Sequence, residues 1–410
     1  MRTEPDRGWT GPRQALVIGA GLSGSAVAYS LANRGWAVTV LDQAAGVGAG
    51  ASGLPVGLAA PHVSPDDNVL SRITRAGVQA TLKRAETLLQ SGTDWSLSGV
   101  LEHNLGGKRR LAAADLNAHP SDGDTLNPTI QASAAQIAAA GLPLGTPALW
   151  HGHAGWLRPR PLVAAQLKTT GIQVRWSQKV TSIARRADGW AVLGAQGETL
   201  GQAPLLVVAS AFDSLTLLQD QPGFAVPLNP LRGQVSFGLM ADVHGALGVG
   251  SSTSANTTRK PTLPPFPVNG HGSFISGVPT LDGELGWFIG STFERNCEQA
   301  PVRIEDHAAN QVRLATLLPD LGEAMKPQFE SEKIQGWAGL RCTLPNRLPA
   351  VGPIDNQRLP GLWISAGMGA RGISLAVLCG ELTAACLASE PMPLPPELAK
   401  HLWAERYAST

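Results

Sequence analysis

The stretch QALVIGAGLSGSAVAYSLANRGWAVTVLD, residues 14–42, decides the fold. An apolar run over 14–18 leads into a G-x-G-x-x-G turn at 19–24. A helix-forming segment follows to about residue 33, and a second apolar run over 37–41 ends at Asp42. This order is that of a βαβ unit whose glycine turn lies at the N-terminus of the helix. We therefore predict an α/β fold with a dinucleotide-binding, Rossmann-like domain.

The glycine turn has the residues that dinucleotide binding needs. Gly19 allows the tight turn, Gly21 lets the backbone approach a pyrophosphate, and Gly24 lets the helix pack closely on the strand. Free N–H groups at the helix N-terminus favour an anion. Asp42 can accept hydrogen bonds from a ribose and would repel the 2′-phosphate of NADP. A glycine turn without a ligand is the alternative. The predicted cofactor-binding residues here are Gly19, Ala20, Gly21, Leu22, Ser23, Gly24 and Asp42.

A second glycine segment, GMGARGI at residues 367–373, distinguishes a flavin from a nicotinamide cofactor. A reduced flavin bears negative charge on one edge, which a helix N-terminus and a cation such as Arg371 stabilise. An ordinary strand-to-helix turn is the alternative, but it would not need four small residues and an arginine together. The sequence therefore predicts FAD, with contacts at Gly367, Gly369, Ala370, Gly372 and Ile373.

The order of the remaining elements predicts two interleaved domains. Two apolar runs fit further parallel strands and three segments fit antiparallel strands: 205–209, 362–365, 234–239, 273–278 and 287–293. The expected FAD domain comprises 12–90, 155–218 and 335–395. An α+β substrate domain on an antiparallel sheet would comprise 91–154 and 219–334, with terminal tails at 1–11 and 396–410.

Composition argues against several classes of protein. The formal net charge is +1 over 410 residues, so a nucleic acid or membrane partner would need a local basic patch. The four cysteines include no C-x-x-C, which predicts a reduced, cytoplasmic protein. No segment reaches the ~18 consecutive apolar residues that span a bilayer. His151 and His153 form H-x-H without accompanying acids or cysteines, so we expect no metal site.

With both glycine segments in place, the chain resembles the D-amino-acid-oxidase superfamily of FAD enzymes over nearly its whole length. The resemblance implies a FAD domain of the glutathione-reductase/D-amino-acid-oxidase type. It also implies that GWLRP, 155–159, starts a second nucleotide segment. The FAD contacts that it implies are Asp42, Gln43, Ala51, Ser52, Val180 and Ala209.

Longer motifs resemble one branch of that superfamily. They are GASG at 50–53, PHVSP at 61–65, GLRC at 339–342, LPAVG at 348–352 and GARG at 369–372. This set is similar to the oxidoreductase half of the bifunctional tRNA 5-methylaminomethyl-2-thiouridine biosynthesis proteins. It implies oxidative removal of the carboxymethyl group, as glyoxylate, from 5-carboxymethylaminomethyl-(2-thio)uridine at the tRNA wobble position. The anticodon loop would be the substrate, and a separate methyltransferase would perform the following step.

Two arginines in these motifs would hold the substrate. Arg341 and Arg371 match positions at which glycine-oxidase-type enzymes bind the substrate carboxylate, and a guanidinium fork suits a carboxylate. The alternative for each is a pair with a buried acid. His62 is a third catalytic candidate, and fixing a loop is its alternative role. Cys342 could link covalently to flavin, as in some sarcosine oxidases, but its register argues against that.

Two functions fit these residues. A tRNA-modifying oxidoreductase needs basic residues around a wide mouth. A small-molecule amine oxidase, acting on glycine, sarcosine or a D-amino acid, needs a narrow pocket without a basic rim. Candidate phosphate contacts are Lys108-Arg109-Arg110, Arg72/Arg75/Lys83, Arg158/Arg160 and Arg185/Arg186, each with a solvated surface as its alternative. The sequence carries no signal for the oligomeric state.

Overall fold

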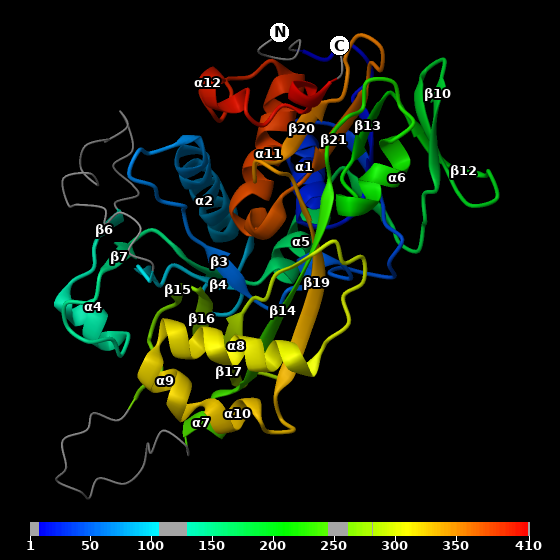
Figure 1. Cartoon of the computed structure of the whole chain (residues 1–410). Coiled ribbons are helices and arrows are strands. Elements are labelled where there is room, and N and C mark those ends of the chain that lie inside the picture. The colour runs from blue at the N-terminus through cyan, green and yellow to red at the C-terminus, as the bar shows by residue number, and fades with distance from the viewer. Residues whose placement is uncertain (1–7, 106–128, 245–260, 281, 409–410) are drawn as a thin grey trace, which may run out of the picture.

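The computed structural model describes residues 8–105, 129–244, 261–280 and 282–408. Two main sheets organise it: a mostly parallel one in the upper half of Figure 1 and a mostly antiparallel one in the lower half. The long strands β14 (Asn229–Leu239) and β19 (Gln335–Thr343) lie side by side and run from the lower half toward the upper one. The predicted fold class is confirmed, because parallel and antiparallel sheets occur together with helices.

A six-stranded sheet forms the nucleotide-binding half, in the order β20-β21-β13-β1-β2-β9. Its strands are β1 (Gln14–Ile18), β2 (Ala37–Leu41), β9 (Ile172–Arg175), β13 (Leu205–Val208), β20 (Ala350–Pro353) and β21 (Leu362–Ala366). Neighbours run parallel, except that β20 is antiparallel to β21. The βαβ unit predicted over residues 14–42 is confirmed.

Alternate residues of these strands enter two different cores, because side chains alternate across a strand. On one face, Val17, Val40 and Val207 pack in a core shared with helices. These helices are α1 (Leu22–Ala32), α2 (Val69–Leu88), α5 (Pro159–Leu167) and α11 (Gly372–Ala388). On the other face, Leu16 and Leu206 pack in a core shared with an antiparallel meander. Its strands are β10 (Ser182–Arg186), β11 (Gly189–Leu193) and β12 (Thr199–Ala203).

Close packing and buried charges hold α1, the helix that follows the glycine turn. A Cβ on Gly380 of α11 would lie 2.6 Å from the Ala26 carbonyl carbon, so only glycine allows this approach of the two helices. Arg84 of α2 and Arg34 share Glu381 of α11, at 2.6 and 2.9 Å. Arg84 is only 7% exposed, and loss of its partner would leave a buried charge uncompensated. Helix α1 is therefore packed closely against α11.

The other half is built on a nine-stranded sheet. Beside β14 and β19 it contains β5 (Val100–His103), β6 (Thr129–Gln131), β7 (Ala148–His151), β15 (Val268–Gly270), β16 (Gly272–Pro279), β17 (Leu285–Gly290) and β18 (Glu294–Arg295). Its core, around Phe274 and Trp287, is completed by helices. They are α4 (Ala134–Ala139), α7 (Met240–His244), α8 (Ile304–Leu317), α9 (Pro319–Ala324) and α10 (Lys326–Phe329).

The remaining elements are short. A three-stranded sheet consists of β3 (Gly57–Ala59), β4 (Trp95–Ser96) and β8 (Gly155–Leu157). The remaining helices are η1 (Ala51–Gly53), η2 (Ala211–Asp213), α6 (Ser214–Leu218), η3 (Gly369–Arg371), α12 (Pro396–Ala399) and η4 (Ala404–Tyr407). Along the chain, η1 follows β2, η2 follows β13 and η3 follows β21, so each comes after a strand of the nucleotide-binding half.

Two structural features differ from the expected domain limits. Residues 335–343 form β19, which pairs with β14 along its whole length, so they belong to the antiparallel sheet and not to the FAD sheet. Residues 396–408, expected to be a tail, pack on the nucleotide-binding half. Leu402 and Trp403 are buried there, and the Leu402 carbonyl accepts a hydrogen bond from the Val351 N–H at 2.8 Å. The division into domains otherwise stays a prediction.

One segment, Gly369–Ala388, is long and apolar enough to cross a membrane. In the fold it is a core helix, since 78% of its most apolar window is buried. Leu375, Leu378 and Leu382 lie in the core between the helices and the parallel sheet. A helix that is apolar all round is expected in such a position.

Candidate active site

Two cavities adjoin each other. The first lies at the carboxyl ends of the parallel strands, where α/β sheets bind their ligands, and the second is lined largely by the antiparallel sheet. The first has a volume of about 870 Å³ and the second about 1220 Å³. They share a wall made of Leu54, Arg341, Gly367, Met368, Gly369, Ala370 and Ile373. A ligand that filled the first cavity would therefore meet a ligand in the second at Arg341 and the second glycine segment.

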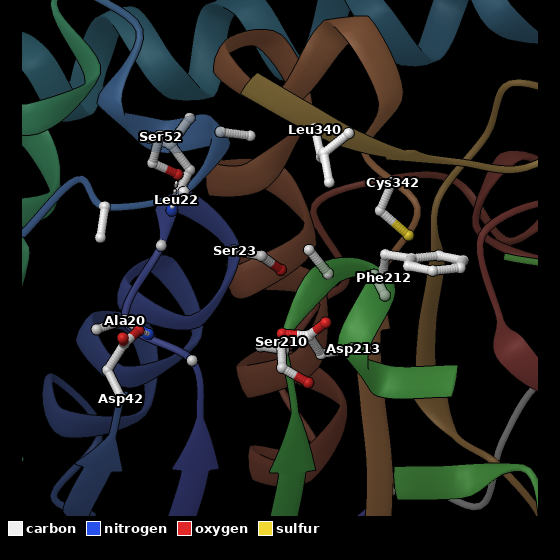
Figure 2. Close-up of a pocket in the computed structure, with 18 of the residues that line it drawn as sticks. Ala20, Leu22, Ser23, Asp42, Ser52, Ser210, Phe212, Asp213, Leu340 and Cys342 are labelled. Carbon is white, nitrogen blue, oxygen red and sulfur yellow. Dashed lines mark hydrogen bonds between the residues drawn. The ribbon is translucent and has the colours of Figure 1, made fainter. Parts of the chain in front are cut away.

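The glycine turn forms one end of the first cavity. Gly19 has φ +101°, a conformation that favours glycine, and a Cβ on Gly24 would lie 1.8 Å from the Gly19 carbonyl oxygen. Gly24 therefore packs α1 against the turn and does not line the cavity. The Leu22 N–H donates to the Ser52 hydroxyl at 2.9 Å, which places η1 over the turn, as Figure 2 shows. No side chain of α1's own N-cap bonds to its first turn, and that turn carries no acidic residue.

Asp42 lies at the end of β2, beside the glycine turn (Figure 2). Its carboxylate accepts hydrogen bonds from the backbone N–H groups of Ala20, at 2.7 Å, and Ala44, at 2.8 Å. A carboxylate has about four acceptor sites, so it keeps capacity for a ribose hydroxyl. Gln43 also lines the cavity, and its side-chain amide donates to Asp213 of η2 at 3.1 Å.

The second glycine segment forms another part of the wall of the first cavity. Gly367 and Gly369 both have positive φ, at +79° and +57°, which explains why glycine occupies these two positions. Helix α11 then begins at Gly372 without a side-chain cap and without an acidic residue in its first turn. Its N-terminal N–H groups thus remain available for a partial or full negative charge.

The predicted cofactor residues converge on this one cavity. All of them line it except Gly24: Gly19, Ala20, Gly21, Leu22, Ser23, Asp42, Gln43, Ala51, Ser52, Val180, Ala209, Gly367, Gly369, Ala370, Gly372 and Ile373. Two helix N-termini without a cap from their own N-cap side chains, a glycine wall without side chains and a fixed carboxylate match a ligand with a diphosphate and a ribose. The residues present therefore fit FAD.

Arg341 reaches the shared wall from β19. Its guanidinium donates to the Ser291 hydroxyl through Nη2, while its buried Nη1 has no hydrogen-bond partner among the described residues. Burial lowers the pKa of Arg341 to about 10, so the group stays charged at neutral pH. A buried charge that lacks a carboxylate partner is costly, and an anionic ligand in the second cavity would supply that partner.

Arg371 and His62 line the second cavity but not the first. Burial and then the charge of Arg347 lower the pKa of Arg371, while Glu102 acts in the opposite direction. Burial and then Arg371 lower the pKa of His62, so its imidazole is neutral at neutral pH. Within the described ranges, neither Arg341 nor Arg371 forms an ion pair with an acid. The alternative role of these arginines, pairing with a buried acid, therefore finds no support.

The lining of the second cavity is strongly cationic. Glu102 is the single acidic side chain among its described lining residues, and His151 holds it at 3.1 Å. Against it stand five arginines: Arg295, Arg313, Arg341, Arg347 and Arg371. An exposed aromatic side chain, Phe293, lies among them. Such a lining favours a ligand with more than one negative charge.

Comparison with known proteins agrees with this geometry. A family model described as FAD dependent oxidoreductase matches residues 14–386. The chain belongs to this family. Both glycine segments, the cavity between them and Arg341 fall inside the matched range.

Relatives of this FAD-dependent oxidoreductase include large bifunctional proteins. It is 44% identical over 402 residues to the tRNA 5-methylaminomethyl-2-thiouridine biosynthesis bifunctional protein MnmC of Polaromonas naphthalenivorans (strain CJ2). The match covers 96% of this chain and 59% of the relative, so the chain spans about three fifths of the length of that curated relative.

Solved structures share the fold of this oxidoreductase at low sequence identity. Iminodiacetate oxidase (IdaA) of Chelativorans sp. BNC1 has a TM-score of 0.70 at 20% identity, over 96% of this chain and 98% of that one. Glycine oxidase from Geobacillus kaustophilus has a TM-score of 0.67 at 20% identity, over 92% and 95%. These likenesses show that the chain has the fold type expected from the sequence.

The cysteine and histidine considered in the sequence analysis occupy the following environments. Cys342 lines the first cavity, but burial raises its pKa to about 12, which keeps the thiol protonated and makes a covalent flavin link unfavourable. His151 is buried between Glu102 and Thr129. No group of three or more His, Cys, Asp or Glu able to hold a metal occurs in the described part of the chain.

The basic clusters proposed from sequence as phosphate contacts do not line the second cavity. This holds for Arg72, Arg75, Lys83, Arg158, Arg160, Arg185 and Arg186, and Arg75 is paired with Asp67 at 3.0 Å. Lys108, Arg109 and Arg110 lie outside the described residues. Sequence reasoning missed Arg295, Arg313 and Arg347, because they come from separate elements and form no cluster along the chain. Asp213 could have been found, since it follows the carboxyl end of parallel strand β13.

Gly233 of β14 leaves the space that the Arg341 guanidinium fills. A Cβ there would lie 2.5 Å from Nη2 and 2.7 Å from Cζ of Arg341. We expect Gly233→Ala to displace the guanidinium and to lower kcat/KM by on the order of 10- to 100-fold, because small misplacements of binding groups are costly. FAD content should not change. Gly152→Ala is the matched control, since its Cβ would meet no atom closer than 3.6 Å. Equal kinetics for both variants would contradict this packing role.

Proposed function

We propose that this oxidoreductase removes the carboxymethyl group, as glyoxylate, from 5-carboxymethylaminomethyl-(2-thio)uridine at the tRNA wobble position. The observation that supports this most is the buried guanidinium of Arg341, with an unpartnered Nη1, on the wall shared by the FAD cavity and a cationic second cavity. The similarity to MnmC of Polaromonas naphthalenivorans supports the identity of the nucleoside.

The substrate is an N-substituted glycine, and this chain's own residues would align it. Arg341 would bind the carboxylate through charge-assisted hydrogen bonds and fix the glycyl carbon at the shared wall. When bound, FAD would take up the two electrons that leave the CH–NH group. The remaining imine hydrolyses to glyoxylate and a primary amine. Positioning can lower such a barrier by about 7–11 kcal/mol in the best cases, so a protein base is not required.

Arg371 and His62 would act at the same end of the substrate. The positive charge of Arg371 lies in the second cavity and would add to the attraction of the carboxylate. The lowered pKa of His62 leaves a neutral imidazole that can accept a hydrogen bond from the substrate amine. Both roles are proposals that follow from the position of these side chains in the cavity.

The size and charge of the second cavity favour a nucleotide over a free amino acid. A volume of about 1220 Å³ and five arginines exceed what one glycine carboxylate needs. Enzymes that modify a base must admit it out of the stack together with its phosphates. The alternative, oxidation of glycine, sarcosine or a D-amino acid, would use Arg341 and Arg371 in the same way but leaves Arg295, Arg313 and Arg347 without a role.

The proposed substrate implies a cellular setting. Transfer RNA would place the enzyme in the cytoplasm. The primary amine that remains on the uridine is a substrate for N-methylation, which we assign to another catalytic unit.

Nucleoside analysis in cells tests this function. In cells whose own copy of the gene carries Arg341→Ala, we expect the carboxymethylaminomethyl nucleoside to accumulate in tRNA and its aminomethyl and methylaminomethyl products to decline. An unchanged nucleoside profile, with the variant protein present and FAD-loaded, would rule out the tRNA substrate and leave the small-molecule alternative.

A further inference from the structure

An exposed aromatic ring lies in the cationic second cavity. Phe293 is in the short connection between β17 and β18 and is 53% exposed, although it is a large apolar side chain. Single exposed apolar residues are common and need no explanation by themselves. The position of Phe293 is different, because its ring lines the cavity that contains Arg341.

Two guanidinium groups from different elements hold this ring. The Cζ atom of Arg341, on β19, lies 5.0 Å from the ring centroid, and that of Arg313, on α8, lies 5.8 Å away. Both distances are in the range of cation–π contacts. Arg313 is itself positioned by His271, at 3.3 Å, and its buried Nε has no hydrogen-bond partner among the described residues. The ring thus lies within cation–π distance of both the proposed carboxylate-binding arginine and a second cation, and about half of its surface stays exposed.

The length of the proposed substrate matches this arrangement. In a carboxymethylaminomethyl uridine, four single bonds separate the carboxylate carbon from the uracil ring. With bond lengths near 1.5 Å, this linker spans at most about 5 Å. A carboxylate on Arg341 therefore brings the uracil within reach of Phe293, whose ring centroid is 5.0 Å from the same guanidinium.

We infer that Phe293 is the stacking residue for the extruded wobble base. The uracil ring would stack on the exposed part of the Phe293 side chain while Arg341 holds the carboxylate. Arg295 and Arg313, which line the same cavity, would contact the flanking phosphates. Aromatic residues that stack on unpaired bases are a general means of binding single-stranded RNA. This inference rests on the proposed function and adds to it a residue that binds the nucleobase.

The test compares Phe293→Leu with Phe293→Trp on tRNA that carries the carboxymethylaminomethyl group, using FAD-loaded protein. Replacing a stacking aromatic residue by alanine typically weakens nucleic-acid binding by roughly 5- to 140-fold. We expect Phe293→Leu to raise KM for the tRNA and Kd for a labelled anticodon stem-loop by a factor in that range, with a smaller change in kcat. Phe293→Trp should restore both constants toward the wild-type values, because it keeps an aromatic face.

A matched control and two outcomes make the test decisive. Ile304→Ala removes another exposed apolar side chain, 83% exposed and outside the cavity lining, and should change neither constant. If wild-type protein converts the tRNA and Phe293→Leu has wild-type KM and Kd, the stacking role is wrong while the proposed function stands. Equal losses in Leu and Trp variants would also overturn it, since they would indicate packing. If wild-type protein does not convert the tRNA, both proposals fail.

Discussion

Arg341→Ala is expected to lower kcat/KM for substrate oxidation strongly while the protein keeps its FAD. Removing one partner of a buried charge pair typically costs about 2–5 kcal/mol, which corresponds to roughly a 30- to 5,000-fold loss in kcat/KM. The loss should be largest for Ala and smaller for Lys, because lysine keeps the charge but not the planar fork. FAD should stay bound, since the hydrogen bonds that fix the glycine turn and Asp42 do not involve Arg341.

The measurement is the rate at which substrate reduces the bound flavin in the absence of oxygen, monitored by the visible absorbance of the flavin. Arg175→Ala is the control, because Arg175 is exposed, lines neither cavity and bonds to the Leu200 carbonyl. Substrate reduction by Arg341→Ala at the wild-type rate would show that another group binds the carboxylate.

Gly24→Ala is expected to yield a protein without FAD. Its Cβ would lie 1.8 Å from the Gly19 carbonyl oxygen, a distance that forces the turn or α1 to move. Overpacking of this kind typically costs about 1–3 kcal/mol in the free energy of unfolding. The turn that moves is also the one that offers N–H groups to the diphosphate, so cofactor binding and stability should fall together.

This variant is checked by FAD absorbance after purification and by thermal unfolding with added FAD. Wild-type protein should show a higher Tm when FAD is added, because a ligand that binds only the folded state stabilises it. Gly24→Ala should show a lower Tm and little response to FAD. A yellow Gly24→Ala protein with the wild-type Tm would contradict the packing described at this turn.

The cofactor cavity was largely predictable from sequence because its parts are continuous motifs. The residues 19–24 and 367–373 each combine a strand end, a turn and a helix start, and Asp42 follows the next strand along. The spacing within each motif fixes where its residues lie. Sixteen of the predicted cofactor positions therefore line one cavity, and Gly24 has the packing role expected of it.

The second cavity was only partly predictable, because tertiary structure assembles it. Arg341 and His62 were found through motif resemblance, whereas Phe293, Arg313 and Glu102 come from a loop, a helix and a strand that no local pattern connects. The net charge of +1 also conceals five arginines gathered at one site. Predicted basic clusters elsewhere on the chain, such as Arg185 and Arg186, do not line this cavity. Basic residues that are neighbours in sequence therefore did not indicate where the cationic site forms.

The most direct measurement is conversion of modified tRNA by purified, FAD-loaded protein, with mass spectrometry of the nucleosides and assay of glyoxylate. The account predicts that the carboxymethylaminomethyl nucleoside is replaced by the aminomethyl nucleoside, with one glyoxylate released for each. It would be contradicted if the tRNA stayed unchanged while glycine or sarcosine reduced the same protein.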